Sequence, residues 1–500
     1  MSTDRPKQRV VIAGGGTAGW VVAAALGKLL GKLVDVTLVE SDEIGTIGVG
    51  ESTIPTARTF HKLLGIDERA FMQSTHATFK LGIAFEDWGA IGDRYFHSFG
   101  VLGRSTWMAD FHHIWLRGRT EGVASALGDY CFELQAAEAG RFATSDKATI
   151  NYAYHLDASA YAGFLRGVAE AGGVKRIEGR IAEVRQAAES GFITALALDS
   201  GQVVEGDLFI DCTGFRGLLI EGALKTGYED WTQWLSTDSA IAVQTEASGG
   251  ARPYTRASAH KAGWQWQIPL RHRVGNGMVF ASEHLSDDEA GAMLAERVDG
   301  EMLTEPRLIR FRTGRRRKSW NKNCVAFGLS SGFVEPLEST SIHLIMIGVM
   351  RLVQLFPFGG MNEALADRYN LQAERELEGI RDFIILHYHL NQRSDSAFWR
   401  RCREMDIPES LAQRIALFQE NAQVYQDAHD LFRVDSWVQV MLGQRLEPRS
   451  YHHMGRLMSP EQLKQALTDL KGNIARAVDK MPQHQEFLER YYLAPAAAAA

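Results

Sequence analysis

The sequence predicts a mixed α/β fold, with a Rossmann-like nucleotide-binding lobe and a mostly helical C-terminal lobe. Three observations predict this fold. The chain opens with a strand, glycine turn and helix pattern, and residues 236–330 alternate apolar and polar residues as antiparallel strands do. From residue 361 onward the pattern is mostly helical and charged. A chain of 500 residues, of which 45% are hydrophobic, is long enough to form two or more lobes.

The glycine turn near the N-terminus has the spacing of a dinucleotide-binding site. A β-branched run at residues 9–13 is followed by Gly14, Gly16 and Gly19 in G-x-G-x-x-G order, and then by helix formers. Gly14 permits the tight turn, Gly16 lets a pyrophosphate approach the backbone, and Gly19 lets helix and strand pack closely. A glycine turn that binds no ligand is the alternative interpretation.

A second strand, at residues 34–39, supports the nucleotide site. It ends at Glu40, about twenty residues after the last glycine, where an acid that binds a ribose belongs. We therefore predict that this unit holds a dinucleotide cofactor. Its predicted cofactor-binding residues are Gly14, Gly16, Thr17, Ala18, Gly19 and Glu40.

The middle of the chain adds further strands to this lobe. We predict a helix over residues 156–170 that ends at a glycine pair, and strands over 177–184 and 192–198. A buried strand at 208–214 runs into Thr-Gly, which lets the backbone come close to a cofactor. The alternating region 236–330 contains the sequence W-x-W-x-I-P at 264–269. Paired tryptophans on a strand are most often core aromatics.

Residues 332–341 put carboxylates, hydroxyls and small residues at the expected start of a helix over 342–356. A helix start carries free N–H groups and a partial positive charge, so it is a natural place for an anion or a flavin edge. Ser339 and Thr340 taken alone are more often ordinary N-caps. We expect Ser339 to cap this helix.

Composition argues against several classes of protein. A net charge of −7 argues against a dedicated nucleic-acid binder. The four cysteines have no metal-ligand spacing, so we expect reduced thiols and no metal. The apolar run 342–356 is interrupted by Arg351 and is too short to span a bilayer, and the polar N-terminus leaves no room for a signal peptide. We therefore expect a soluble, cytoplasmic protein without membrane partners.

Taken together, these segments resemble the flavin-dependent halogenases of the tryptophan-halogenase family. The resemblance is weakest after about residue 400 and rests on residues 14–20, 48–53 with Pro55, 78–83, 264–269 and 332–340. It implies an FAD/NAD(P)-binding, Rossmann-like fold of the flavoprotein monooxygenase type. The expected FAD-binding lobe is 1–360, with substrate-lobe insertions near 85–150 and 225–300, a helical part of the substrate lobe at 361–490 and a disordered tail at 491–500.

The resemblance implies a two-component enzyme. A separate flavin reductase supplies FADH2, and FADH2, O2 and chloride or bromide yield hypohalous acid, which reaches a lysine beside a small aromatic substrate. Lys80 matches that lysine, and an ammonium or its halogenated amine there orients and activates the oxidant. Glu338 matches the catalytic carboxylate, which polarises the oxidant or takes the ring proton. A surface salt bridge for Lys80 and a helix N-terminal acid for Glu338 are the plain alternatives.

The resemblance also suggests halide and flavin contacts. It implies a halide near the backbone amides of Thr340 and Ser341. The chain departs there from the pattern F-x-x-P-x-x-S-x-G, because Ser341 replaces the glycine, so the local torsion and the halide size preference stay open. The further residues at matching flavin positions are Val184, Leu329 and Leu344.

The substrate expected from the resemblance is free indole or an indole derivative. Phe99 and His97 match a segment that packs against an indole face, although a core phenylalanine is nearly as common an interpretation. Residues 451–455 lack the tyrosine pair and nearby acid that grip free tryptophan, so we expect tryptophan to be a poor substrate. A flavin-dependent aromatic hydroxylase and a non-catalytic FAD-binding or redox-sensing protein are the competing functions.

Overall fold

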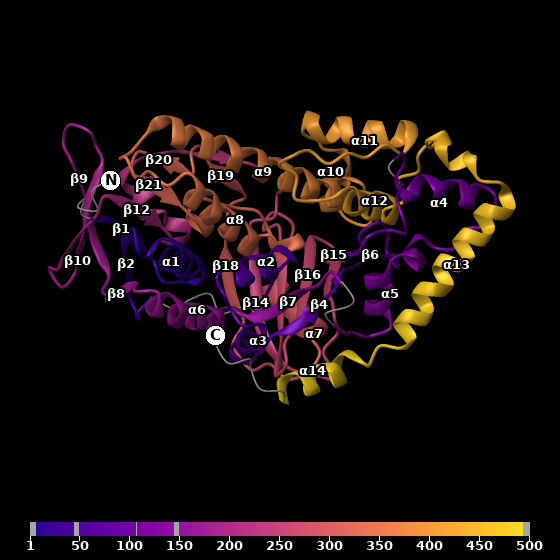
Figure 1. Cartoon of the computed structure of the whole chain (residues 1–500), viewed down its shortest axis with the longest axis horizontal. Coiled ribbons are helices and arrows are strands. Elements are labelled where there is room, and N and C mark those ends of the chain that lie inside the picture. The colour runs from indigo at the N-terminus through magenta and orange to yellow at the C-terminus, as the bar shows by residue number, and fades with distance from the viewer. Residues whose placement is uncertain (1–6, 45–49, 107, 145–149, 494–500) are drawn as a thin grey trace.

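The predicted glycine turn follows the first strand of a six-stranded sheet with the order β20-β21-β12-β1-β2-β8 (Figure 1). All neighbours pair in parallel except β20, which is an antiparallel edge strand. The computed structural model describes residues 7–44, 50–106, 108–144 and 150–493. The strands are β1 (Gln8–Ala13), β2 (Val34–Glu40), β8 (Lys175–Glu178), β12 (Leu208–Asp211), β20 (Trp320–Asn321) and β21 (Cys324–Ala326).

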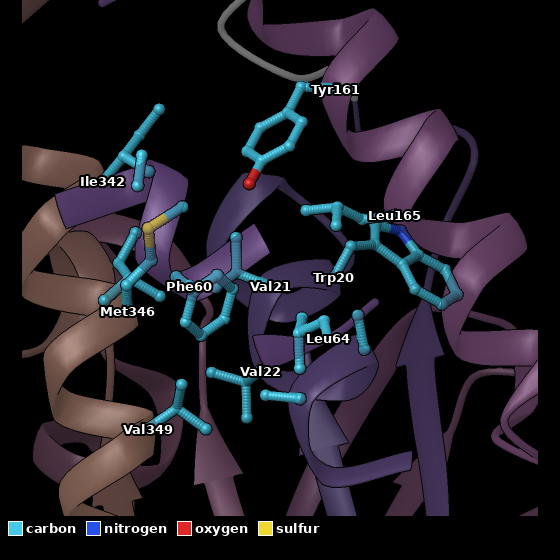
Figure 2. Close-up of a cluster of buried hydrophobic side chains, with 14 of the residues drawn as sticks. Trp20, Val21, Val22, Phe60, Leu64, Tyr161, Leu165, Ile342, Met346 and Val349 are labelled. Carbon is cyan, nitrogen blue, oxygen red and sulfur yellow. The ribbon is translucent and has the colours of Figure 1, made fainter. Parts of the chain in front are cut away.

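Helices cover one face of this sheet. Helix α1 (Thr17–Leu30) is buried over most of its surface, because it lies between the sheet and the helices outside it. Its Trp20, Val21 and Val22 gather with side chains of α6 (Ala158–Ala171) and α8 (Ser341–Gln354) (Figure 2). Helices α2 (Thr56–Leu63) and α3 (Glu68–Thr75) pack into the same core. The start of α8 is thereby fixed relative to the glycine turn.

A three-stranded antiparallel sheet covers the opposite face. It consists of β9 (Ile181–Gln186), β10 (Ile193–Leu198) and β11 (Val203–Glu205). Strand β1 serves both faces because its side chains alternate: Val10 and Ile12 join the helical core, whereas Val11 and Ala13 pack towards β10. Most of the two strands predicted at 177–184 and 192–198 therefore forms a hairpin outside the central sheet. Only residues 177–178 belong to β8 of the central sheet.

The two predicted insertion regions share one seven-stranded sheet with the order β18-β14-β17-β16-β15-β5-β6. Strands β5 and β6 come from the first region, and the parallel pairing of β15 with β5 joins them to the second. The bounds are β5 (Gly82–Glu86), β6 (Arg94–Ser98), β14 (Ser239–Glu246), β15 (Thr255–His260), β16 (Gly263–Pro269), β17 (Arg273–Phe280) and β18 (Arg307–Arg310). The same two regions of the chain also contain the helices α4 (Phe111–Thr120), α5 (Phe132–Glu138) and α7 (Asp287–Arg297).

Two small sheets connect the lobes. In the first, β3 (Gly50–Ser52) and β4 (Thr78–Lys80) flank β7 (Ala153–Asp157), and both pair with it antiparallel. Ser52 and Lys80 are thus brought close through one shared neighbour strand. The second contains β13 (Tyr228–Asp230), β19 (Gly314–Arg316) and β22 (Gly332–Phe333). It places the segment before α8 beside the central sheet.

The C-terminal part is helical, as predicted. The helices are α9 (Glu363–His389), α10 (Ala397–Glu404), α11 (Glu409–Asn421), α12 (Val434–Gly443), α13 (Pro460–Asp479) and α14 (His484–Leu493). Helices α13 and α14 wrap around the molecule and return the chain towards α3 (Figure 1). Tyr491 donates a hydrogen bond to Glu68 at 2.8 Å. The prediction of a disordered tail at 491–500 is therefore wrong for residues 491–493, which are helical. Residues 494–500 lie outside the described residues.

Candidate active site

A cavity of about 470 Å³ opens beside the glycine turn. The turn itself and Glu40 line one part of it, while Ser52, Ser339 and Trp266 contribute other parts of the wall. The N-terminal lobe, the seven-stranded sheet and the start of α8 therefore share one cavity. Side chains from segments hundreds of residues apart meet around it.

The glycine turn has the shape that a pyrophosphate needs. Gly14 has φ +104, and a Cβ there would lie 2.3 Å from the carbonyl oxygen of Cys212. A Cβ on Gly19 would lie 1.9 Å from the carbonyl oxygen of Gly14, so only glycine lets α1 approach this closely. A Cβ on Gly16 would meet nothing within 4 Å, which leaves that backbone open to the cavity. These residues fit FAD.

The other predicted cofactor residues divide into two groups. Thr17, Ala18, Leu329 and Leu344 line the cavity. Val184 does not line it: this residue pairs with Leu196 in the outer hairpin and packs against that core. The cavity wall takes the preceding residues of the same segment, which are Gly179, Arg180 and Ile181. The Val184 side chain packs against the small core, so a flavin contact of this residue through its backbone stays a prediction.

Lys80 is fully buried, and its amine is held by three oxygens. Nζ donates to the Oγ of Ser339 at 2.7 Å, to the Oγ of Ser52 at 3.1 Å and to the carbonyl oxygen of Thr53 at 3.4 Å. Burial lowers the pKa of Lys80 to about 7, although the negative charges of Glu338 and Glu51 oppose that shift. Lys80 thus has both its charged and its neutral form within reach near neutral pH.

Ser339 does not cap α8, so the predicted capping role of this residue is wrong. It adopts the left-handed conformation with φ +59, and the N-cap position belongs to Thr340, whose side chain makes no capping bond. The Oγ of Ser339 instead lies 2.6 Å from the Oγ of Ser52 and accepts the hydrogen bond of Lys80. Ser52 and Ser339 both line the cavity, so they stand between it and Lys80.

Glu338 lies between two histidines. Its Oε2 is 2.8 Å from Nδ1 of His97 and its Oε1 is 2.9 Å from Nε2 of His387. Burial raises the pKa of Glu338, but the two histidines outweigh it and hold the pKa at about 2. Burial lowers the pKa of His387, whose Nδ1 lies 2.6 Å from the hydroxyl of Tyr95. The site therefore holds a buried carboxylate that stays ionised at physiological pH.

Sequence reasoning missed His387, which lies on the buried face of α9. Its only signal is a histidine in the long apolar stretch of a helix, a pattern that usually marks a satisfied core residue. Its neighbour Phe383 packs 5.4 Å from the ring of His97. A helix predicted only as part of a substrate lobe thus supplies a direct contact to Glu338.

Phe99 lies beside Lys80, and His97 contacts Glu338. The amine of Lys80 is 5.3 Å from the centre of the Phe99 ring. Phe99 packs with Ile54 and Leu431, and its carbonyl oxygen accepts a hydrogen bond from Arg433 at 2.9 Å. The segment before α12 therefore packs against Phe99. Neither the motif around Lys80 nor the motif around Glu338 indicates this contact.

The residues predicted to hold a halide lie at the start of α8. Ser341 lines the cavity, whereas Thr340 is buried and its Oγ1 has no hydrogen-bond partner in the part of the chain that the structure describes. Thr340 is the N-cap and Ser341 the first residue of a 14-residue helix, where backbone N–H groups lack partners within the helix. This arrangement suits an anion.

Residues 451–455 form no pair of tyrosines. Tyr451 instead lies beside the guanidinium of Arg456, 5.8 Å from the ring centre. Glu461 is exposed and accepts a hydrogen bond from Ser459. In the described ranges, no group of three or more His, Cys, Asp or Glu side chains could hold a metal ion, and no helix is long and apolar enough to cross a membrane. The four cysteines are free.

The chain is similar along nearly its whole length to known halogenases. The tryptophan halogenase family model matches residues 9–460. A tryptophan 6-halogenase of Streptomyces toxytricini is 35% identical over 97% of this chain and 98% of its own length. A tryptophan 7-halogenase of Lentzea aerocolonigenes is 34% identical over the same shares.

Solved structures give the same result. A flavin-dependent halogenase from Xanthomonas campestris is 53% identical with a TM-score of 0.96, covering 99% of this chain and 100% of its own. A flavin-dependent halogenase from Brevundimonas sp. BAL3 is 46% identical with a TM-score of 0.93, covering 97% of this chain and 99% of its own.

Proposed function

The chain belongs to the tryptophan halogenase family, and on that premise we propose that it halogenates free indole or an indole derivative. It is a flavin-dependent halogenase that uses FADH2, a halide and O2, and a separate flavin reductase supplies the FADH2. The substrate and the roles of individual residues in this chain are what we propose. The observation that carries the proposal is the hydrogen bond from Lys80 to Ser339, next to Glu338 and at the cavity wall.

The cavity supplies the cofactor and halide sites. Gly14, Gly16 and Gly19 shape the turn that receives the pyrophosphate, and Glu40 at the end of β2 lines the cavity where a ribose would bind, with its Oε1 paired to Arg176 at 2.5 Å. When bound, the reduced flavin activates oxygen, so that the halide is oxidised to hypohalous acid. The backbone amides of Thr340 and Ser341 hold the halide at the positive end of α8.

Lys80 orients the oxidant. Its ammonium donates a hydrogen bond to the oxygen of hypohalous acid in place of one serine oxygen, and it supplies the proton that this oxygen needs to leave as water. Because the surrounding site is buried, this hydrogen bond is stronger than it would be in water. Burial of Lys80 also keeps an oxidant bound to it from diffusing away.

Glu338 takes the proton that the ring loses. As the carbon–halogen bond forms, the bond between halogen and oxygen breaks, and the ring C–H proton passes to the Glu338 carboxylate. His97, hydrogen-bonded to Oε2, and His387, 2.9 Å from Oε1, keep that carboxylate ionised. One proton leaves Lys80 and one arrives at Glu338, so the summed charge of the two side chains is unchanged, and transfer of that proton from Glu338 back to Lys80 restores both for the next turnover.

The substrate proposal rests on the aromatic region around Lys80. Phe99 offers a ring face for stacking, and His97 flanks it while holding Glu338. Two of the relatives named above, those of Streptomyces toxytricini and Lentzea aerocolonigenes, are tryptophan halogenases, so tryptophan is the main alternative substrate. The absence of a tyrosine pair at 451–455 favours a substrate without a zwitterion to bind.

The experiment that tests the function combines the protein with FAD, a flavin reductase, NADH, bromide and indole. Product mass is then measured by liquid chromatography and mass spectrometry. Replacement of hydrogen by bromine is the expected result. Oxygen insertion without bromine would instead support an aromatic hydroxylase, and no turnover over a panel of indoles with either halide would support a non-catalytic flavoprotein.

A further inference from the structure

A second glutamate, Glu335, lies three residues before Glu338 and is completely buried. Its Oε2 accepts hydrogen bonds from Nε1 of Trp264 at 2.8 Å, the hydroxyl of Tyr388 at 2.8 Å and Oγ1 of Thr237 at 3.3 Å. The donors come from β16, from α9 and from the segment before β14. One carboxyl oxygen therefore ties three separate elements to the segment that carries Glu338.

Helix α9 contacts both glutamates through successive residues. His387 reaches Glu338, and Tyr388 reaches Glu335. Between the glutamates lies a single short turn, Pro336–Glu338, in which the proline ring fixes one backbone torsion. Because the turn is short and is held at both ends by the same helix, a shift of Glu335 must move Glu338 relative to His387.

The surroundings of the two carboxyl groups differ in charge. Burial raises the pKa of Glu335 to about 7, although its three hydrogen-bond donors oppose the shift. The Oε1 of Glu335 has no hydrogen-bond partner in the described part of the chain. Glu335 is also not among the residues that line the cavity. With three donors on one oxygen and no exposed surface, Glu335 is therefore placed to hold the turn.

We propose that Glu335 is a positioning residue. Its side chain accepts hydrogen bonds from Trp264, Tyr388 and Thr237 and thereby holds the Pro336–Glu338 turn in place. As a result, Glu338 stays between His97 and His387. This gives Trp264, the first tryptophan of W-x-W-x-I-P, a role beyond core packing. The inference rests on the proposed function, because the placement of Glu338 matters only if Glu338 acts in the reaction.

Two substitutions at Glu335 separate the hydrogen bonds from the charge. Glu335→Gln keeps an acceptor oxygen for the three donors and is expected to brominate indole with a kcat within about threefold of the wild type. Glu335→Leu leaves the donors without an acceptor and is expected to lower kcat by about tenfold to 100-fold, since small displacements of a catalytic group have effects of this size. The KM values for indole and bromide should change by less than about threefold, because neither contacts Glu335.

Trp264→Phe and Asp382→Asn complete the test. Trp264→Phe keeps Glu335 but removes one donor, so it keeps the inference testable if Glu335→Leu does not fold, and its expected loss of kcat is about threefold to tenfold. Asp382→Asn is the matched control: Asp382 is buried on α9 but binds Arg381 and Ser410, so its kcat should stay unchanged. A crystal structure of Trp264→Phe should show Glu338 Oε2 moved from its 2.8 Å contact with His97.

A folded Glu335→Leu variant with wild-type kcat, or a Trp264→Phe variant with wild-type kcat and an unmoved Glu338, would overturn the positioning role. A Glu335→Gln variant as impaired as Glu335→Leu would overturn it as well, because the acceptor oxygen would then not be what matters. Failure of the proposed function is distinguishable from these results, since in that case the wild-type protein itself would not brominate any indole.

Discussion

The amine of Lys80 donates a hydrogen bond to the hydroxyl of Ser339 at 2.7 Å, across 259 residues of sequence. This contact brings the strand β4 to the segment that carries Glu338, and it does so at the wall of the cavity that receives the cofactor. The proposed amine and carboxylate therefore belong to one buried site. Ser339 can make this contact because it lies in the left-handed conformation, outside the helix that follows it.

Gly14→Ala should prevent FAD binding. The new Cβ would lie 2.3 Å from a backbone carbonyl oxygen, and φ +104 disfavours any side chain there. We expect an affinity for FAD at least about 100-fold weaker, measured by quenching of flavin fluorescence, because the turn must deform before it can bind. Gly163→Ala in α6, where a Cβ meets nothing within 4 Å, is the matched control and should bind FAD normally. Equal FAD affinities of the two variants would contradict the proposed cofactor site.

Glu338→Gln should lower kcat for indole bromination by about 100-fold to 1,000-fold, the usual cost of removing a general base. FAD affinity and the KM for indole should change little, since the amide has almost the same shape. Steady-state kinetics of Glu338→Gln and Glu335→Gln side by side provide the comparison, because the two glutamates lie three residues apart and only Glu338 is expected to need its charge. Similar activity of the two variants would argue against the role of Glu338.

Lys80→Met should change the pH dependence of stability. The pKa of Lys80 is about 7 in the folded protein, against 10.5 for an ordinary lysine, so between these values the unfolded chain holds more protons and wild-type stability rises with pH. The methionine variant lacks this rise. Its advantage in free energy of unfolding should be largest near pH 7 and below, and should shrink by at most about 1.4 kcal/mol per pH unit towards pH 10. Urea unfolding at pH 6.5 and pH 9 measures it, and an advantage that is the same at both would contradict the buried, low-pKa lysine.

Indole should be a better substrate than tryptophan. We expect a kcat/KM at least about tenfold higher for indole, because a site that does not pair an ammonium and a carboxylate loses free energy when it buries them. Competition between the two substrates in one reaction, with the products resolved by mass, measures the ratio directly. A preference for tryptophan would instead place this chain's specificity with that of the tryptophan halogenases it resembles.

The features that sequence alone predicts well are local ones. The glycine turn, β2 ending at Glu40 and the start of α8 depend on short stretches whose residues restrict the backbone themselves. The predicted helical C-terminal part is also confirmed, because helical periodicity is a local signal. The expected lysine and glutamate came from the resemblance to a family, since nothing in their spacing indicates that they meet.

Contacts set by tertiary structure were the ones missed. Which residues of the segment around β9 face the cavity depends on how the β9–β10 hairpin packs: Gly179, Arg180 and Ile181 line it, and the flavin contact of Val184 stays a prediction. His387 and Tyr388 reach the two glutamates only because α9 passes beside them. Ser339 was expected to cap α8, but hydrogen bonds with Lys80 and Ser52 hold it elsewhere. Such contacts require the packed fold.

The most direct test of the account is product formation by Lys80→Ala, measured by mass spectrometry with FAD, a flavin reductase, NADH, bromide and indole. We expect no brominated indole above the level formed without enzyme, while FAD affinity stays at the wild-type value because Lys80 does not line the cavity. Bromination of indole by the folded, FAD-binding variant at a rate near that of the wild type would contradict the account.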